Sequence, residues 1–154
     1  MFQQIVYDWN QTDKAFPKDK AIHQLFEEQV VKTPDNIALI FEGDKLTYQE
    51  LNEQSNQLAR YIRDKYKSIS SNELQSDTLI ALYLDRGLEM IISILAVFKA
   101  GAAYVPISPE FPQERIDYIL KDTQTQILIS QTHLTDKLES NIGKNSKYGN
   151  FFPK

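Results

Sequence analysis

The 154-residue chain contains no cysteine and only five glycines. Without cysteine there is no disulfide framework, no thiolate nucleophile and no cysteine metal site. The glycines form neither the GxGxxG fingerprint of dinucleotide-binding folds nor the GxxxxGK[ST] loop that holds a triphosphate. The absence of cysteine also fits a cytoplasmic protein, which is the location we expect.

Positive charge is scarce and scattered along the chain. Seventeen Lys and Arg against twenty-one Asp and Glu give a net charge of -4. Nucleic-acid binding needs clustered basic residues, so we expect no nucleic-acid partner.

Residues 88–107 are apolar enough to resemble a membrane span, but they contain Glu89 and Lys99. A charge deep in hydrocarbon costs about 3 kcal/mol, so a buried helix and strand explain the segment better, and we expect no membrane partner.

The beginning of the chain predicts an arm followed by a helix. Residues 1–17 show no sustained period and are typical of an extended, linker-like arm. Asp19 is a candidate cap for the helix, and Thr33, followed by Pro34, is expected to end it. The helix itself is predicted from four apolar residues at helical spacing, Ile22, Leu25, Phe26 and Val30.

A hairpin and a long helix come next. The apolar run at 37–41 and the turn residues at 42–45 predict a β-hairpin. Thr47 and Glu50 have the spacing of a capping box, in which each side chain accepts a hydrogen bond from the other residue's backbone N–H. The helix behind this box has a predicted inward face made of Leu51, Ser55, Leu58, Ala59, Ile62 and Tyr66. Its predicted water-facing side carries Glu53, Gln57, Arg60 and Arg63.

The second half of the chain alternates strands and helices. Strands are predicted at 79–84, 103–107 and 126–130, the first of them apolar on both faces. A helix at 88–99 is ended by Gly101, and Pro112 begins another with Ile116, Ile119 and Leu120 facing inward. Leu134 and Leu138 suggest a short last helix. Because strands and helices alternate at short spacing, we expect an α/β fold, a partial mixed or parallel sheet layered with helices.

Few side chains are placed to carry chemistry. Parallel sheets bind ligands at the carboxyl ends of their strands, which directs attention to the turn at residues 84–87 (LDRG). For Arg86 and Gly87, a capped turn with a surface charge is favoured over a phosphate site. His23 and His133 lack neighbouring ligand residues in the sequence, so metal binding and catalysis are disfavoured for both.

The remaining candidates have equally simple explanations. Glu110, Glu114 and Asp117 lie close together, but the amino end of a helix favours acidic residues through its dipole. No GxSxG serine elbow occurs. From the residues alone we therefore assign no catalytic, cofactor-binding or metal-ligating residue.

Two stretches resemble a known family. Residues 46–51 (LTYQEL) resemble the first core motif of nonribosomal peptide synthetase adenylation domains, L-[TS]-Y-x-E-L. Residues 98–108 (FKAGAAYVPIS) resemble the second, L-K-A-G-x-A-Y-[VL]-P-[LI]-D, with Phe98 and Ser108 in place of the usual Leu and Asp. Residues 9–12 (WNQT) resemble the linker between a condensation domain and an adenylation domain.

The resemblance, which extends over residues 5–140, implies a specific activity and specific partners. The family has a large amino-terminal α/β domain with stacked sheets and a small mobile carboxy-terminal domain. It uses Mg and ATP to convert an amino acid to an aminoacyl adenylate. The acyl group then passes to the phosphopantetheine thiol of a carrier protein, so carrier and condensation domains are the implied partners of the parent enzyme.

One departure from the family limits what the chain is expected to do alone. The family's third motif, a Ser/Thr/Gly-rich loop ending in Lys-Gly that wraps the ATP phosphates, does not follow the strand at 126–130. We therefore expect an amino-terminal fragment of an adenylation domain at 18–140, with a divergent polar tail at 141–154, that binds no cofactor and is inactive alone. For Lys99 and Tyr104, packing and surface charge are favoured over substrate contact.

Two other functions remain open at this point. The chain is alternatively a non-catalytic interaction or structural module, or a gene remnant, that associates with itself or with the missing remainder of the domain. Open sheet edges and apolar strands favour such association. An independent small nucleotide-binding domain is the third possibility, against which the missing glycine-rich loop argues.

Overall fold

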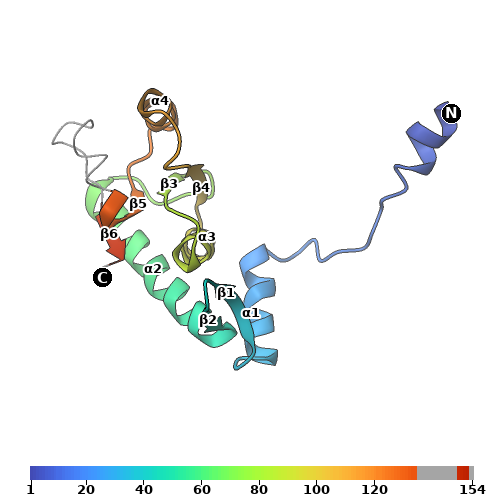
Figure 1. The fold of residues 1–154 in the computed structure, drawn as a ribbon, viewed down its shortest axis with the longest axis horizontal. Coiled ribbons are helices and arrows are strands. Elements are labelled where there is room, and N and C mark those ends of the chain that lie inside the picture. The colour runs from blue at the N-terminus through green and yellow to red at the C-terminus, as the bar shows by residue number, and fades with distance from the viewer. Residues whose placement is uncertain (135–148, 153–154) are drawn as a thin grey trace.

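The amino-terminal arm is exposed throughout its length. The computed structural model describes residues 1–134 and the backbone of residues 149–152. Every side chain in residues 1–20 is exposed, and this segment extends away from the rest of the molecule (Figure 1). It contains one short π-helix, η1 (Gln4–Asp8), which the aperiodic sequence did not predict. The division of the chain at residue 17 stays a prediction.

Helix α1 (Ile22–Lys32) confirms the first predicted helix, but its start differs from the prediction. Ala21, not Asp19, occupies the capping position. The Ala21 backbone N–H donates to Gln24 Oε1 at 2.7 Å, which is one half of a capping box, whereas Ala21 has no side-chain acceptor to offer the first N–H groups of the helix. The helix ends at Thr33, as predicted.

The predicted hairpin is confirmed as the antiparallel pair β1 (Ile37–Phe41) and β2 (Asp44–Thr47), but residues 44 and 45, predicted as turn residues, belong to β2. Its turn places Glu42 and Gly43 in the left-handed region, at φ 48° and 97°. A two-residue turn in which both residues are left-handed has a twist that matches the twist of the flanking strands. Glycine adopts the left-handed conformation without a steric penalty.

The capping box at the start of α2 (Tyr48–Ile69) is also confirmed. Thr47 Oγ1 accepts from the Glu50 N–H at 3.1 Å, and the Thr47 N–H donates to Glu50 Oε2 at 2.8 Å. The bond from the Thr47 backbone lowers the pKa of Glu50, so the carboxylate stays charged and the box stays complete at neutral pH. All residues of the predicted inward face are buried, namely Leu51, Ser55, Leu58, Ala59, Ile62 and Tyr66.

The main sheet has the order β4-β3-β5-β6 with every pair parallel, which confirms the predicted pairing. Its strands are β3 (Leu79–Tyr83), β4 (Ala103–Ile107), β5 (Leu128–Gln131) and β6 (Gly149–Phe152). Strand β5 begins two residues later than predicted. Strand β6 lies within the polar tail, where the sequence shows no clear period and predicted no strand.

Two further helices connect the strands. Helix α3 (Leu88–Ala100) ends at Gly101, whose φ of 88° is the left-handed cap expected there. Helix α4 is Gln113–Thr123, so Pro112 lies one position before the helix instead of opening it. Ile116 and Leu120 are buried and Ile119 is half-buried. Residues 132–134 are helical, and Leu138 lies outside the described residues.

Helices cover both faces of the sheet, with α2 and α3 on one side and α4 on the other (Figure 1). Along β3, Ile80 and Leu82 face the α2–α3 core, whereas Ala81 and Tyr83 face α4. This alternation explains why the β3 segment is continuously apolar. Among residues 1–134 and 149–152, no helix combines the length and the apolar composition that a membrane-spanning segment needs.

Candidate functional site

A pocket of about 460 Å³ lies where β3 and β4 end. Ligands bind parallel sheets at this edge, where the strands' carboxyl ends and the following turns meet. The pocket is on the α3 side of the sheet, and its lining comes from β3, the β3–α3 turn, α3, β4 and the loop after β4. These residues are Leu82, Leu84, Asp85, Arg86, Met90, Ile94, Tyr104, Pro106, Ile107, Ser108, Pro109 and Glu110.

The turn after β3 is held by side chains from the end of β5 and the residues that follow it. Gln131 Oε1 accepts from the Asp85 backbone N–H at 3.0 Å, and Asp85 Oδ2 lies 2.6 Å from His133 Nε2. Both members of the Asp85–His133 pair are about half exposed, so water and salt screen the attraction between them. Together the two contacts tie the β3–α3 turn to the neighbouring strand and thereby position Arg86.

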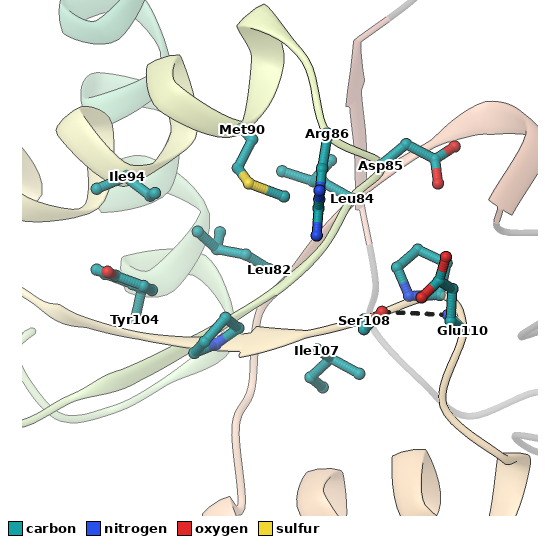
Figure 2. Close-up of a pocket in the computed structure, with 12 residues that line it drawn as sticks. Leu82, Leu84, Asp85, Arg86, Met90, Ile94, Tyr104, Ile107, Ser108 and Glu110 are labelled. Atoms are coloured by element: carbon teal, nitrogen blue, oxygen red, sulfur yellow. Dashed lines mark hydrogen bonds between the residues drawn. The ribbon is translucent and has the colours of Figure 1, made fainter.

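Arg86 is the one cationic side chain among the described residues that line this pocket. Figure 2 shows it extending from the turn toward Ser108, whereas the Asp85 carboxylate points away. The floor beneath it is largely apolar and includes Leu82, Met90 and Tyr104. Ser108 Oγ accepts from the Glu110 N–H at 3.3 Å and so orders the loop after β4. An apolar floor with a few polar groups around it is the usual make-up of a ligand pocket.

The amino end of α3 does not form a phosphate cradle. Helix amino termini bind anions through their free N–H groups and dipole. Here Glu89 is in the first turn, and a Cβ placed on Gly87 would lie 2.9 Å from Glu89 Oε2. The Glu89 carboxylate therefore lies against the turn that a phosphate would approach, and this end of α3 does not fit the phosphates of ATP. Nor, among the described residues, do three His, Cys, Asp or Glu side chains converge to hold a metal ion.

The other candidates from the sequence are not assembled into a site. His133 does have a partner, Asp85, but it is 48 residues away and therefore not evident from sequence spacing. Glu114 lies in the first turn of α4, as the dipole argument predicts. Asp117 accepts from Gln113 Nε2 at 2.7 Å within the same helix. These contacts give the carboxylates of α4 a structural explanation, and no catalytic role is assigned to them or to Glu110.

Lys99 differs most from expectation, because its side chain is buried and is not a surface charge. Its Nζ donates to Asn52 Oδ1 and, at 2.8 Å, to Asn56 Oδ1, both on α2. On the α1 side, Glu27 Oε1 lies 3.6 Å from Nζ and the Phe26 ring centroid lies 5.3 Å away. Burial lowers the pKa of Lys99, and Glu27 partly opposes this effect. Lys99 therefore joins three helices and is a packing residue.

The residues around Lys99 serve the same packing role. Arg63 donates from Nε to the Ala100 carbonyl at 3.1 Å and from its guanidinium to the Lys99 carbonyl. These bonds cap the carboxyl end of α3, where cations are favoured. Phe98 packs edge-on against Tyr104 with ring centroids 5.5 Å apart. The structure thus gives Phe98 an aromatic partner at the position where the family usually has leucine.

Comparison with known sequences identifies relatives that are much longer than this chain. Residues 26–149 match the AMP-binding enzyme family. Tyrocidine synthase 3 of Brevibacillus parabrevis is 49% identical over 132 residues, which is 86% of this chain and 2% of that protein. Gramicidin S synthase 1 of Brevibacillus brevis is 47% identical over 132 residues, which is 86% of this chain and 11% of that protein.

Comparison with solved structures gives the same relationship. Klebsiella oxytoca NpsA bound to 3-hydroxyanthranilyl-AMSN superposes with a TM-score of 0.69 and 30% identity, over 86% of this chain and 25% of NpsA. The nonribosomal peptide synthetase FmoA3, in a form bound to α-methyl-L-serine-AMP, superposes with a TM-score of 0.75 and 26% identity, over 92% of this chain and 15% of FmoA3. With its parallel sheet and both core motifs, the chain belongs to the AMP-binding enzyme family and corresponds to the amino-terminal part of a nonribosomal peptide synthetase adenylation domain.

Proposed function

We propose that this chain is the scaffold portion of an amino-acid-activating enzyme that forms an aminoacyl adenylate from ATP. The observation that carries the proposal is the position of the two core motifs in the fold. The first, residues 46–51, builds the capping box of α2. The second, residues 98–108, contains the buried Lys99, the left-handed Gly101 and strand β4. The proposed location of this activity is the cytoplasm.

The second motif also supplies one wall of the pocket at the strand ends. Tyr104, Pro106 and Ser108 line it from β4 and the following loop, opposite Met90 and Arg86. Substrate pockets are usually apolar with a few convergent polar groups, and this pocket is largely apolar with one arginine. In a complete domain we expect this wall to adjoin the adenylate site.

The complete enzyme requires groups that these residues do not supply. Adenylyl transfer depends on positioned donors and Mg to stabilise the charge that develops on the phosphates. We propose that ATP and Mg are held by later parts of the domain, including the Ser/Thr/Gly-rich loop. A phosphopantetheine-bearing carrier domain is the proposed acceptor, with a condensation domain as a further partner. No step of the reaction is assigned to residues of this chain.

An ATP–pyrophosphate exchange assay tests the proposal. With a panel of amino acids, the 154-residue chain is expected to give no exchange above the protein-free blank, because its described residues form no triphosphate site. Intact gramicidin S synthase 1, assayed in parallel, serves as the positive control. Exchange by the purified chain that depends on one amino acid would contradict the proposal.

A non-catalytic role in association is the second candidate. Strand β4 forms one edge of the main sheet, and several large apolar side chains on α1 and the hairpin are well exposed: Ile22, Val31, Ile37 and Ile40. Exposed apolar side chains and sheet edges favour association with a partner or a second copy. Static light scattering separates the possibilities, since a monomer mass that stays constant with concentration argues against self-association.

A further inference from the structure

A second pocket, of about 410 Å³, lies among α1, α2 and the carboxyl end of α3. The pocket described above lies instead by the amino end of α3 and the strand ends. The two are therefore at opposite ends of a helix that is about 20 Å long. The lining of the second pocket is almost entirely polar: His23, Gln24, Glu27, Asn56, Ala59, Arg60, Arg63 and Lys99.

The second pocket is positively charged, whereas the chain as a whole is negatively charged. The chain carries a net charge of -4. Of the described residues that line the pocket, three (Arg60, Arg63 and Lys99) are cations and only Glu27 is an anion. His23 belongs to the first turn of α1, where the helix dipole adds partial positive charge. A concave surface concentrates such a field, so the pocket is attractive to anions.

Among the described residues, the cations of this pocket divide into two that are fixed and one that is free. Asn52 and Asn56 hold Lys99, and the α3 carbonyls hold Arg63, so these charges keep their places without a ligand. Within residues 1–134 and 149–152, the Arg60 side chain makes no hydrogen bond or ion pair, and it is exposed beside the fixed charges. The guanidinium of Arg60 therefore has its full set of donors available for a ligand.

We propose that this second pocket binds a small oxyanion, with a phosphate dianion as the preferred class. Three cations against one carboxylate leave an excess of two positive charges, which a dianion neutralises and a monoanion does not. Arg60 supplies the paired N–H donors that recognise phosphate oxygens, and the half-buried His23 supplies a further ring nitrogen. Lys99 and Arg63 contribute through their fields from fixed positions.

The experiment is an NMR titration of the full 154-residue chain with inorganic phosphate, run against sodium chloride at matched ionic strength. Saturable shifts are expected for backbone amides of α1 and α2 near His23, Glu27 and Arg60. Arg60→Gln is expected to weaken phosphate binding about tenfold, whereas Arg60→Lys retains part of the affinity because the charge remains. Acetate, a monoanion, is expected to bind more weakly than phosphate.

Arg86→Gln is the matched control, because it removes one arginine from the other pocket. It is expected to leave the phosphate affinity unchanged. The proposal is overturned if phosphate produces no saturable shifts, if chloride reproduces them, or if Arg86→Gln and not Arg60→Gln abolishes them. Since the Arg60 side chain is exposed and bonds to none of the described residues, loss of binding with an otherwise unchanged spectrum reports on the site and not on folding.

Discussion

Replacing Lys99 by alanine is expected to lower the free energy of unfolding by about 2–4 kcal/mol. The substitution removes a buried stem and leaves the Asn52 and Asn56 side-chain oxygens, which Lys99 satisfies, without their donor. Urea denaturation followed by circular dichroism measures the loss as a lower midpoint at unchanged slope. If Lys99 were a surface charge, as its sequence context suggested, the change would stay within about 0.5 kcal/mol.

Lys99→Met separates the two parts of this effect. Methionine restores most of the buried volume but not the donor, so it is expected to recover about half of the loss.

The pH dependence of stability is a further test of the buried Lys99. The pKa of Lys99 in the folded protein lies below its ordinary value of 10.5, so the unfolded chain binds more protons between those two values. Stability of the wild type relative to Lys99→Met should therefore rise as the pH increases through that window.

Leu58→Ala is expected to cost about 3 kcal/mol. Leu58 is fully buried in α2 and belongs to the core cluster that also contains Ile62 from α2, Ile80 from β3 and Val97 from α3. The substitution removes the branched end of the side chain and leaves a cavity between α2, β3 and α3. These elements are closely packed, so the neighbouring side chains can move little to fill the cavity. The measurement is again the urea midpoint.

Val31→Ala is the matched control for Leu58→Ala, since the Val31 side chain is 83% exposed on α1. Its effect is expected to stay within about 0.5 kcal/mol, because no buried surface is lost and alanine is the better helix former. Equal losses at the two positions would mean that the Val31 face is covered in solution, and would support association through that surface.

Much of the fold could be predicted because its signals are local. The Thr47–Glu50 box and the left-handed Gly101 each depend on a few adjacent residues, and both are as predicted. The apolar run of β3 likewise identifies a strand buried on both faces before its partners are known. The local signal was misleading at α1, because the helix begins at Ile22 and Asp19 lies too far before it to be its cap, while Gln24 bonds the Ala21 N–H instead.

Around the two pockets, what the sequence did not predict concerns contacts between residues far apart in the chain. Lys99 is buried because Asn52 and Asn56 lie opposite it once α2 and α3 pack, 47 and 43 residues away in sequence. The Asp85–His133 pair and the pocket around Arg60 likewise depend on which helices and strands become neighbours. Helical spacing shows that Arg60 and Arg63 share the polar face of α2, but not that α3 ends beside them.

The most direct test of the scaffold assignment is a chimera of gramicidin S synthase 1 in which residues 22–134 replace the matching segment. If these residues build the same part of an adenylation domain, the purified chimera should catalyse ATP–pyrophosphate exchange with the amino acid that the unmodified synthase activates. A chimera that folds, as judged by a single cooperative thermal transition, yet gives no exchange would contradict the assignment.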